Sequence, residues 1–425
     1  MNPLKKLCPL YESMSEPSTK TVFKVTVTNH PVSAPTVSAP TVSAPTPSVV
    51  PVVSPSNANS KYVKRGMFGC VLNPALPNDV EGVRTAFPKD VSKLFFKKEA
   101  YDKALLTGDR MATLVGDESH RITPYIRTLR GSNLTPSVQT ECRIKPEDPL
   151  FPVRMPYLGR DISDIQHYYR DIRALSVGII LDQIVKLTTQ VKRLFEAGYI
   201  HGDIRELNVM VHPGTGMMTL IDFDYLKPKK EFITDYAGNF GYYSNPPESL
   251  LLRLFRYGEQ ETVFNKYYTM ANVYKSTKIS KDEIHEAILD SRALFLERNL
   301  KDFTAISDEI MRSFDSYGLG LALDWFLHNV YSFIDTREPT EAHLVAAESR
   351  LSNKGMPYDK PTIIRIFHTI YDIKQIVKQM VALKARARID ILVAHARILA
   401  VVEDWTATAG GKRRATRRQR RKRRL

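Results

Sequence analysis

Cysteine is scarce in this chain, with 3 in 425 residues. Three cysteines cannot build a framework of disulfides, so their scarcity favours a soluble protein of a reducing compartment. Long apolar runs are also missing, because stretches such as 177–181 are far shorter than the ~20 residues that a bilayer span needs. No apolar run of signal-peptide length opens the sequence. A membrane-spanning or secreted protein is therefore not expected, and the predicted location is intracellular.

The composition is otherwise that of an ordinary globular protein, with 43% hydrophobic and 25% charged residues. At about 150 residues per domain, the length allows two or three folded units. The formal net charge is +15, but segment 412–425 holds ten of the lysines and arginines and no acid. Without that segment the other 411 residues carry only +5, so the strongly basic character belongs mainly to the C-terminal end.

The first 60 residues have the composition of a linker. Residues 32–46 read VSAPT three times in succession, and proline at every fifth position excludes a regular helix. The small side chains offer little surface whose burial could offset the entropy lost on ordering. A disordered linker is therefore predicted for 1–60. A ligand for proline-binding modules is the alternative, but no charged PxxP pattern supports it.

From residue 61 onward the pattern indicates folded structure. Short β-rich runs come first, and a charged stretch at 97–115 has helical spacing. Residues 181–197 form an amphipathic helix pattern that Gly198 should end, and two short apolar runs around HPGTG then predict a β-hairpin. The rest is mostly helical, with a buried helix expected at 317–334. A strand-rich front and a helical back predict an α+β protein of two lobes.

The segment 199–226, YIHGDIRELNVMVHPGTGMMTLIDFDYL, carries the most informative constellation. Asp203 follows the end of a helix, Asn208 lies five residues further on, and the hairpin delivers Asp222 at the end of a strand. Mg²⁺ prefers a few hard oxygen ligands and keeps waters and phosphate oxygens for the remainder. Asn208 and Asp222 are therefore the candidate ligands of a Mg-nucleotide site, and Asp203 is free to orient a hydroxyl and accept its proton.

These residues resemble the protein kinase superfamily, in which HGDIRELN corresponds to the catalytic loop and IDFD to the metal-binding motif after it. The resemblance gives Asp203 the catalytic position and gives Asn208 and Asp222 the metal positions. It places Arg205 where the family has a lysine that contacts the γ-phosphate. It implies a kinase-like fold, with a small strand-rich N-lobe and a larger helical C-lobe, that binds ATP and Mg²⁺. His201 is expected to support the loop as a structural residue.

Upstream, KRGMFGCV resembles the glycine-rich loop that covers the ATP phosphates. The resemblance gives Gly66 and Gly69 a close approach to the phosphates, lets Phe68 cap them, and places Val71 against adenine. The family's first glycine is a lysine here, so the loop departs from the family pattern.

The next landmark, VSKLF at 91–95, resembles the strand whose lysine holds the α- and β-phosphates, which makes Lys93 the candidate. The resemblance also implies a helical glutamate that reaches back to this lysine. Glu99 begins a helical pattern but lies closer in sequence than the family usually has it. Glu118 is the alternative, and both stay open.

Three further landmarks follow in the family's order. YYSNPPES resembles the end of the activation segment, with Glu248 as its glutamate. DSYGLGLAL resembles the start of the buried central helix, and Asp315 is expected to accept hydrogen bonds from the backbone near His201. PYDKPT resembles a motif whose cation pairs with Glu248, which makes Lys360 the expected partner, in a looser pair than an arginine would give.

Three positions depart from the family pattern. Gly202 replaces an arginine that pairs with a phosphorylated activation loop, so that phosphate switch is not implied. Arg205 replaces a lysine, and its guanidinium can still stabilise transferring charge. Asp224 replaces the glycine after Asp222 and Phe223, and it would either bind a second metal or point to solvent.

The function that the resemblance implies is ATP-dependent transfer of a phosphoryl group to a protein hydroxyl by a serine/threonine-protein kinase. The same core also resembles the aminoglycoside and choline kinase group, which makes a small-molecule kinase the alternative. The glycine-rich loop, the PPE segment and DSYGLG favour protein substrates. A pseudokinase that acts through its basic tail is a third hypothesis, and the retained Lys93, Asp203, Asn208 and Asp222 argue against it.

The basic tail and the glycine-loop neighbourhood GMFGCVLNPAL together resemble serine/threonine kinases of large nucleocytoplasmic DNA viruses. That resemblance implies the host cytoplasm, the nucleus or the virion as the location. Ten cations in 412–425 favour binding of a nucleic acid or an import receptor through the tail, and no membrane contact is expected. The predicted divisions are a disordered linker at 1–60, an N-lobe at 61–160, a C-lobe at 161–375 with a helical insertion at about 250–312, a C-terminal helix at 376–408 and a disordered tail at 409–425.

Overall fold

The computed structural model of the chain describes residues 61–65, 69–76, 78–80, 83–85, 90–117, 120–125, 128–236, 244–251, 265, 267–269, 279–298, 303–351 and 358–422. The predicted linker at 1–60 lies outside these residues. So do Gly66, Phe68 and Glu118, together with most of the first half of the predicted insertion.

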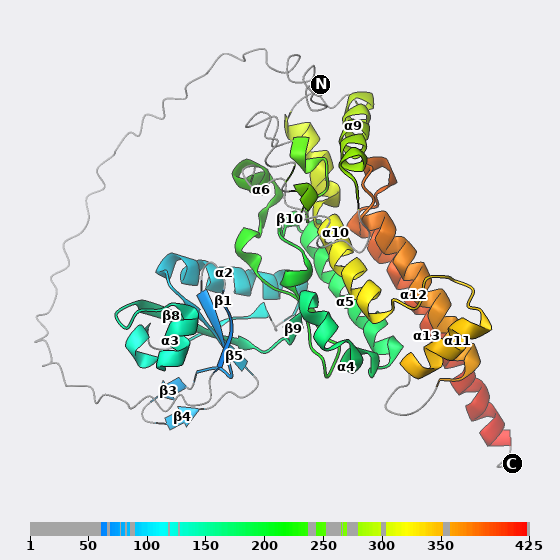
Figure 1. Ribbon diagram of the computed structural model, residues 1–425, viewed down its shortest axis with the longest axis horizontal. Helices are drawn as coiled ribbons and strands as arrows, with labels where there is room; N and C mark the ends of the chain where they lie inside the picture. The colour runs from blue at the N-terminus through cyan, green and yellow to red at the C-terminus, as the bar shows by residue number, and fades with distance from the viewer. Residues whose placement is uncertain are drawn as a thin grey trace, which may run out of the picture.

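An antiparallel sheet dominates the first part of the described chain (Figure 1). Its main strands follow one another in the order β1 (Lys61–Arg65), β2 (Gly69–Asn73), β5 (Asp90–Phe95) and β8 (Pro149–Pro156). The short strands β6 (Thr123–Pro124) and β7 (Leu129–Arg130) both pair with β8, and β3 (Asn78–Val80) and β4 (Val83–Thr85) form a separate pair.

Helix α2 (Lys98–Val115) packs on this sheet, close to the predicted range 97–115. Its buried Ala104 meets Phe95 of β5 and Val153 of β8 in one apolar cluster. The helix ends at Gly116, whose φ of 66° is a left-handed conformation that glycine adopts without steric cost. One face of α2 is therefore fixed by apolar burial and its end by a glycine cap.

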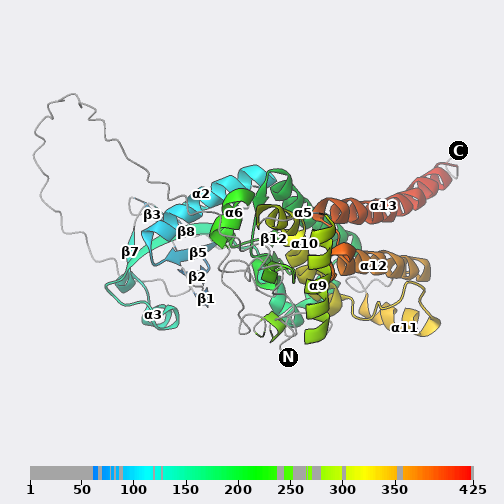
Figure 2. The same cartoon turned by 90° about the horizontal axis from the view of Figure 1, so that it is seen from above.

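The remainder is mostly helical and is built around α5, α10, α12 and α13 (Figure 2). The helices are α3 (Pro136–Cys142), α4 (Tyr169–Arg173), α5 (Val177–Glu196), α6 (Lys229–Tyr236), α9 (Lys281–Glu297), α10 (Phe303–Val330), α11 (Glu341–Arg350), α12 (Lys360–Met380) and α13 (Ile391–Lys422). Short 3₁₀ turns are η3 (Gly131–Asn133), η4 (Ile162–His167), η5 (Glu206–Asn208), η6 (Phe223–Tyr225) and η7 (Ala385–Ala387). The apolar faces of α5, α10, α12 and α13 meet in the largest hydrophobic core.

The predicted helix stop and hairpin are both confirmed. Helix α5 gives way to Gly198, whose φ is 74°, and β10 (Tyr199–Ile200) follows and pairs with β13 (Lys227–Pro228). β11 (Val209–Val211) and β12 (Met218–Leu220) form the hairpin, and β9 (Arg160–Asp161) adds to it beside β11. The two pairings bring 201–208 and 221–226 together, because each segment lies between strands that are paired.

The C-terminal region differs from the prediction of one helix at 376–408. Helix α12 ends at Met380 and α13 begins at Ile391, because Asp390 caps the new helix by accepting the backbone N–H of Val393 at 3.0 Å. Trp405 anchors α13 to α12, with the Arg365 guanidinium 4.1 Å from its ring centre. Helix α13 then continues to Lys422 (Figures 1 and 2), whereas the sequence predicts disorder from 409.

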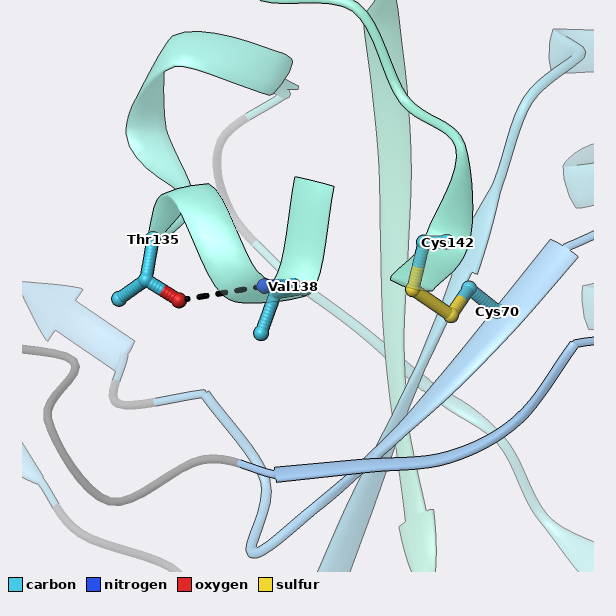
Figure 3. The surroundings of a disulfide bond; sticks show 4 residues. All are labelled: Cys70, Thr135, Val138 and Cys142. Atoms are coloured by element: carbon cyan, nitrogen blue, oxygen red, sulfur yellow. Dashed lines mark hydrogen bonds between the residues drawn. A yellow bond between two sulfur atoms is a disulfide. The ribbon is translucent and has the colours of Figure 1, made fainter. Parts of the chain in front are cut away.

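A disulfide joins Cys70 of β2 to Cys142 at the end of α3 (Figure 3). Both cysteines are fully buried, and the helix that carries Cys142 is capped by Thr135, which accepts the N–H of Val138. The scarcity of cysteine predicted a protein without a framework of disulfides, whereas the structure pairs two of the three cysteines. The bond closes a loop of 72 residues. In the chain-entropy account, a cross-link over a loop of that length lowers the entropy of the unfolded chain and so stabilises the folded state by about 4 kcal/mol.

The α+β class predicted from the sequence is confirmed, since a smaller strand-rich part accompanies a mostly helical one. Within the described part of the chain, no helix has the length and the apolar character needed to cross a bilayer.

Candidate active site

The loop after β10 is held by a carboxylate from the central helix. Asp315 of α10 accepts the backbone N–H of His201 at 2.7 Å and that of Gly202 at 3.0 Å. Burial raises the pKa of Asp315 to about 6, although these two hydrogen bonds act in the opposite direction. The contact predicted for Asp315 is therefore present, and it fixes the backbone just before Asp203.

Gly202 has a structural reason to be glycine. Its φ is 82°, and a Cβ at this position would overlap the ring of Phe232, which is fully buried. The ring of Phe232 packs edge-on against Phe314 of α10, so it has little room to withdraw. An arginine could not occupy position 202 in this arrangement.

Asp203 lies nearly buried, with 9% of its surface exposed. The side-chain amide of Asn208 donates to its Oδ2 and to its main-chain oxygen, each at 2.8 Å. Arg205 Nε lies 3.3 Å from the other carboxylate oxygen. Burial raises the pKa of Asp203 to about 6, with a further contribution from the charge of Asp222, while Arg205 and Asn208 lower it. The structure thus brings the predicted base, the amide and the arginine together.

Asp222 follows the hairpin and has an unusual backbone conformation for a residue with a side chain. Its φ is 64° and its ψ is 67°, in the left-handed region. The strand end that precedes it is held beside Asn208, because Ile221 N–H donates to the main-chain oxygen of Asn208 at 2.9 Å. Non-glycine residues in this conformation cost on the order of 1 kcal/mol and persist where their surroundings fix them, often at functional sites.

Asp224 joins the same cluster, which the sequence left undecided. Burial raises the pKa of Asp224 to about 6, and the charge of Asp222 and a hydrogen bond between the two carboxyls raise it further. Lys93 and Lys103 lower it, so both ammonium groups lie near this carboxyl. The Asp222 and Asp224 carboxyls therefore lie together, and Lys103 donates to the main-chain oxygen of Asp224 at 2.5 Å.

Lys93 lies on β5, with its Nζ 4.9 Å from the ring centre of Phe95. Its cross-strand partner is Val71, and Gly69 is paired with Phe95 two residues along. A Cβ on Gly69 would overlap the main-chain oxygen of Leu94, so only glycine fits there. Gly69, at the end of the predicted glycine-rich loop, thus lies on the strand next to the one that carries Lys93, the predicted phosphate-binding residue.

Glu99 does not take the role that the resemblance implied. It lies exposed in the first turn of α2, and no hydrogen bond or ion pair joins it to Lys93 in the described chain. Glu118, the alternative, lies outside the described residues. The charge of Lys93 lowers the pKa of Asp224.

The predicted pairing of Lys360 with Glu248 is wrong. Lys360 pairs with Glu341 at 2.5 Å on the surface. Glu248 is instead bound by Arg388, which follows the η7 turn and donates through both terminal nitrogens, one of them at 3.0 Å from Oε2. Both side chains are almost fully buried. No sequence signal pointed to Arg388, because 140 residues separate the pair.

His201 is the structural residue that the sequence predicts. It is fully buried, and its Nδ1 accepts the backbone N–H of Asp203 at 3.4 Å. Burial lowers the pKa of His201 to about 4, so the ring is neutral. Phe223 packs edge-on against this ring and against that of His120, which the sequence did not single out.

The donor set suits a magnesium ion. Asn208 uses its amide nitrogen on Asp203, which leaves the amide oxygen as the atom that could bind a cation. A cation would also relieve the repulsion that raises the pKa values of Asp203 and Asp224 beside Asp222. Within the described residues, no group of three or more His, Cys, Asp or Glu side chains is placed so that it could hold a metal ion. Two protein ligands, Asn208 and Asp222, fit a metal that keeps waters and phosphate oxygens as its other ligands.

No protein-family model matches the chain. A search of the curated proteins also finds no significant match. The chemistry of the site is therefore inferred from its own residues.

Proposed function

We propose that this chain is a kinase of the protein kinase superfamily, with a two-lobed kinase-like fold, that transfers the γ-phosphoryl group of ATP to serine or threonine hydroxyls of a protein. The observation that carries the proposal is the convergence of Asp203, Asn208 and Asp222 from a loop and a hairpin. Lys93 stands next to the same cluster from the sheet.

Each side chain has a distinct task in this proposal. The Asp203 carboxylate orients the substrate hydroxyl and accepts its proton. The Arg205 guanidinium, held 3.3 Å from Asp203, stabilises negative charge beside it. Lys93 binds the α- and β-phosphates. Asn208 and Asp222 would hold Mg²⁺, which when bound neutralises phosphate charge.

Protein substrates are favoured over small molecules by segment 244–251. This segment is buried, and the Arg388–Glu248 pair anchors it to the chain between α12 and α13. Its sequence corresponds to the end of the activation segment in the resemblance, which the small-molecule kinases generally lack. The buried pair therefore supports a protein substrate.

The test is a transfer assay with purified protein, labelled ATP and Mg²⁺, in parallel with a basic protein, an acidic protein, choline and an aminoglycoside. Label in a protein supports the proposal, whereas label only in a small molecule supports the alternative. Asp203→Asn should lower transfer by at least about 100-fold and leave ATP binding nearly intact, since general-base catalysis contributes 10²–10⁴-fold. Transfer by this variant at the wild-type rate would contradict the role of Asp203.

A further inference from the structure

The disulfide starts at the base of the predicted glycine-rich loop. Cys70 is the second residue of β2, and its Cα partners are Arg65, the last residue of β1, and Leu94 of β5. Positions 66–68 of the predicted loop fall in the sequence between β1 and β2. The bond therefore fixes one of the two strands that flank this loop, directly opposite the end of the other.

The other end of the bond lies in an excursion from the sheet. Residues 131–148 leave β7 and return to β8, and the ends of this segment meet because Gly131 N–H donates to the main-chain oxygen of Asp148 at 3.0 Å. The strands on either side are paired as well, with Leu129 opposite Leu150. The 131–148 excursion can therefore open without separating the strands that carry it.

Few side chains attach the helix of this excursion to the sheet. Helix α3 has seven residues, which is too short for a stable helix on its own, and its buried residues are Val138 and Cys142. Leu134 and Ile144 join them in a small apolar cluster with side chains of the strands. Both sulfurs are buried (Figure 3), so an attacking thiol reaches them only when the excursion opens.

We propose that the Cys70–Cys142 bond is a redox-sensitive restraint on nucleotide binding. When oxidised, it holds the strands beside the glycine-rich loop in the arrangement that binds ATP. When reduced, it releases the 131–148 excursion and weakens the binding of ATP. The inference deepens the proposed function and rests on it.

A dithiol supplies the electrons for this change. One thiolate of the dithiol attacks a sulfur of the bond and forms a mixed disulfide, and the other cysteine leaves as a thiolate that takes up a proton. The second thiol of the reductant then attacks the mixed disulfide, closes the reductant's own disulfide and releases the remaining cysteine. Two electrons and two protons thus pass from the dithiol to the two cysteines, and oxidation is the reverse.

The restraint is tested first without nucleotide, on the full chain. Hydrogen exchange is followed by mass spectrometry on the oxidised protein and after reduction with dithiothreitol. Reduction should speed amide exchange at least about tenfold at 131–148 and at 69–73, because the cross-link adds to the free energy of local opening. Helix α5, which lies in the helical part, should stay protected.

The second readout is the affinity for ATP, measured by isothermal titration calorimetry with Mg²⁺. Reduction should raise the Kd about tenfold, as expected if the arrangement that binds ATP falls to about a tenth of the molecules. Because linkage is reciprocal, saturating Mg-ATP should shift the equilibrium between reduced and oxidised chain toward the oxidised form by the same factor, in a fixed buffer of reduced and oxidised dithiothreitol.

Cysteine variants separate the bond from other effects of the reductant. Cys142→Ser removes the bond and leaves β2 unchanged, so it should bind ATP as the reduced wild type does and should not respond to dithiothreitol. Cys70→Ser should behave in the same way, and Cys142→Ser remains informative if Cys70→Ser fails to fold. Cys8→Ser is the matched control and should keep the full response of the wild type.

Three outcomes separate the possibilities. Equal affinity for ATP in the oxidised and the reduced chain overturns the inference, even if 131–148 exchanges faster. Loss of protection throughout α5 on reduction also overturns it, because the bond would then support the whole fold. A chain that binds no ATP in either state, but in which exchange at 69–73 still responds to reduction, supports the restraint on the strands and overturns the proposed function alone.

Discussion

Arg388 and Glu248 form an ion pair with only 1% and 2% of their side chains exposed. Arg388 also donates to Ser313 and to the main-chain oxygens of Ala382 and Leu383, and its guanidinium lies 5.1 Å from the ring centre of Tyr317. The pair thus joins segment 244–251 to the chain between α12 and α13. Its donors are satisfied on several sides, which is the condition under which a buried charge is tolerated.

Removal of one partner should be costly. Glu248→Gln leaves the Arg388 charge buried without its counter-charge, and we expect a loss of about 3–5 kcal/mol in the free energy of unfolding, measured by urea denaturation. Lys360→Gln removes an exposed pair with Glu341 and should cost no more than about 1 kcal/mol. A larger loss for the Lys360 variant than for the Glu248 variant would restore the pairing predicted from the sequence.

Gly202 should be intolerant of any side chain. We expect Gly202→Ala to destabilise the fold by about 2 kcal/mol or more, because the left-handed backbone strain adds to the overlap with Phe232. Gly198→Ala is the matched control: its φ is 74° but the space around it is open, so only the strain of about 1 kcal/mol applies. Thermal melting of the two variants gives the comparison. Equal losses would show that Phe232 does not restrict position 202.

His201 should make stability depend on pH. Its pKa of about 4 in the folded state lies below the value of about 6.5 in the unfolded chain, so the unfolded state binds the proton first as the pH falls. The contribution of the neutral ring is complete above pH 6.5 and is lost progressively toward pH 4, by up to about 3 kcal/mol.

The measurement compares wild type with His201→Asn by urea denaturation between pH 7 and pH 4. The variant keeps an acceptor near the position of Nδ1 but does not titrate, so the stability advantage of wild type should shrink as the pH falls. Other groups that titrate in this range, such as Asp315, affect both proteins and largely cancel. A constant difference across the range would contradict a buried neutral His201.

The basic end of α13 should bind polyanions. Ten cations in 412–425 predict binding to duplex nucleic acid whose affinity falls steeply with salt, because phosphate neutralisation releases counterions. A chain that ends at residue 411 should lose this binding and keep its phosphoryl transfer. Fluorescence anisotropy at several salt concentrations measures the effect. Binding that is independent of salt, or that survives the truncation, would contradict an electrostatic role for the tail.

Features that depend on neighbouring residues could be predicted from local sequence patterns. The stop of α5 at Gly198, the hairpin of β11 and β12, and the order of Asp203, Asn208 and Asp222 around it all follow from local spacing and backbone preference. The Asp315 contact could be expected only because the resemblance supplied it. Local patterns carry this information because a helix or a hairpin is stabilised within a few residues of its own chain.

Contacts between residues that lie far apart in the sequence become visible only in the folded chain. Packing pairs Glu248 with Arg388 and not with Lys360, places Phe232 over Gly202, and brings Cys70 and Cys142 into a disulfide. These partners are paired because the packing of separate elements brings them within a few ångströms. The sequence holds many residues that could pair with a given charged or aromatic side chain. Their spacing along the chain does not show which of them is the partner.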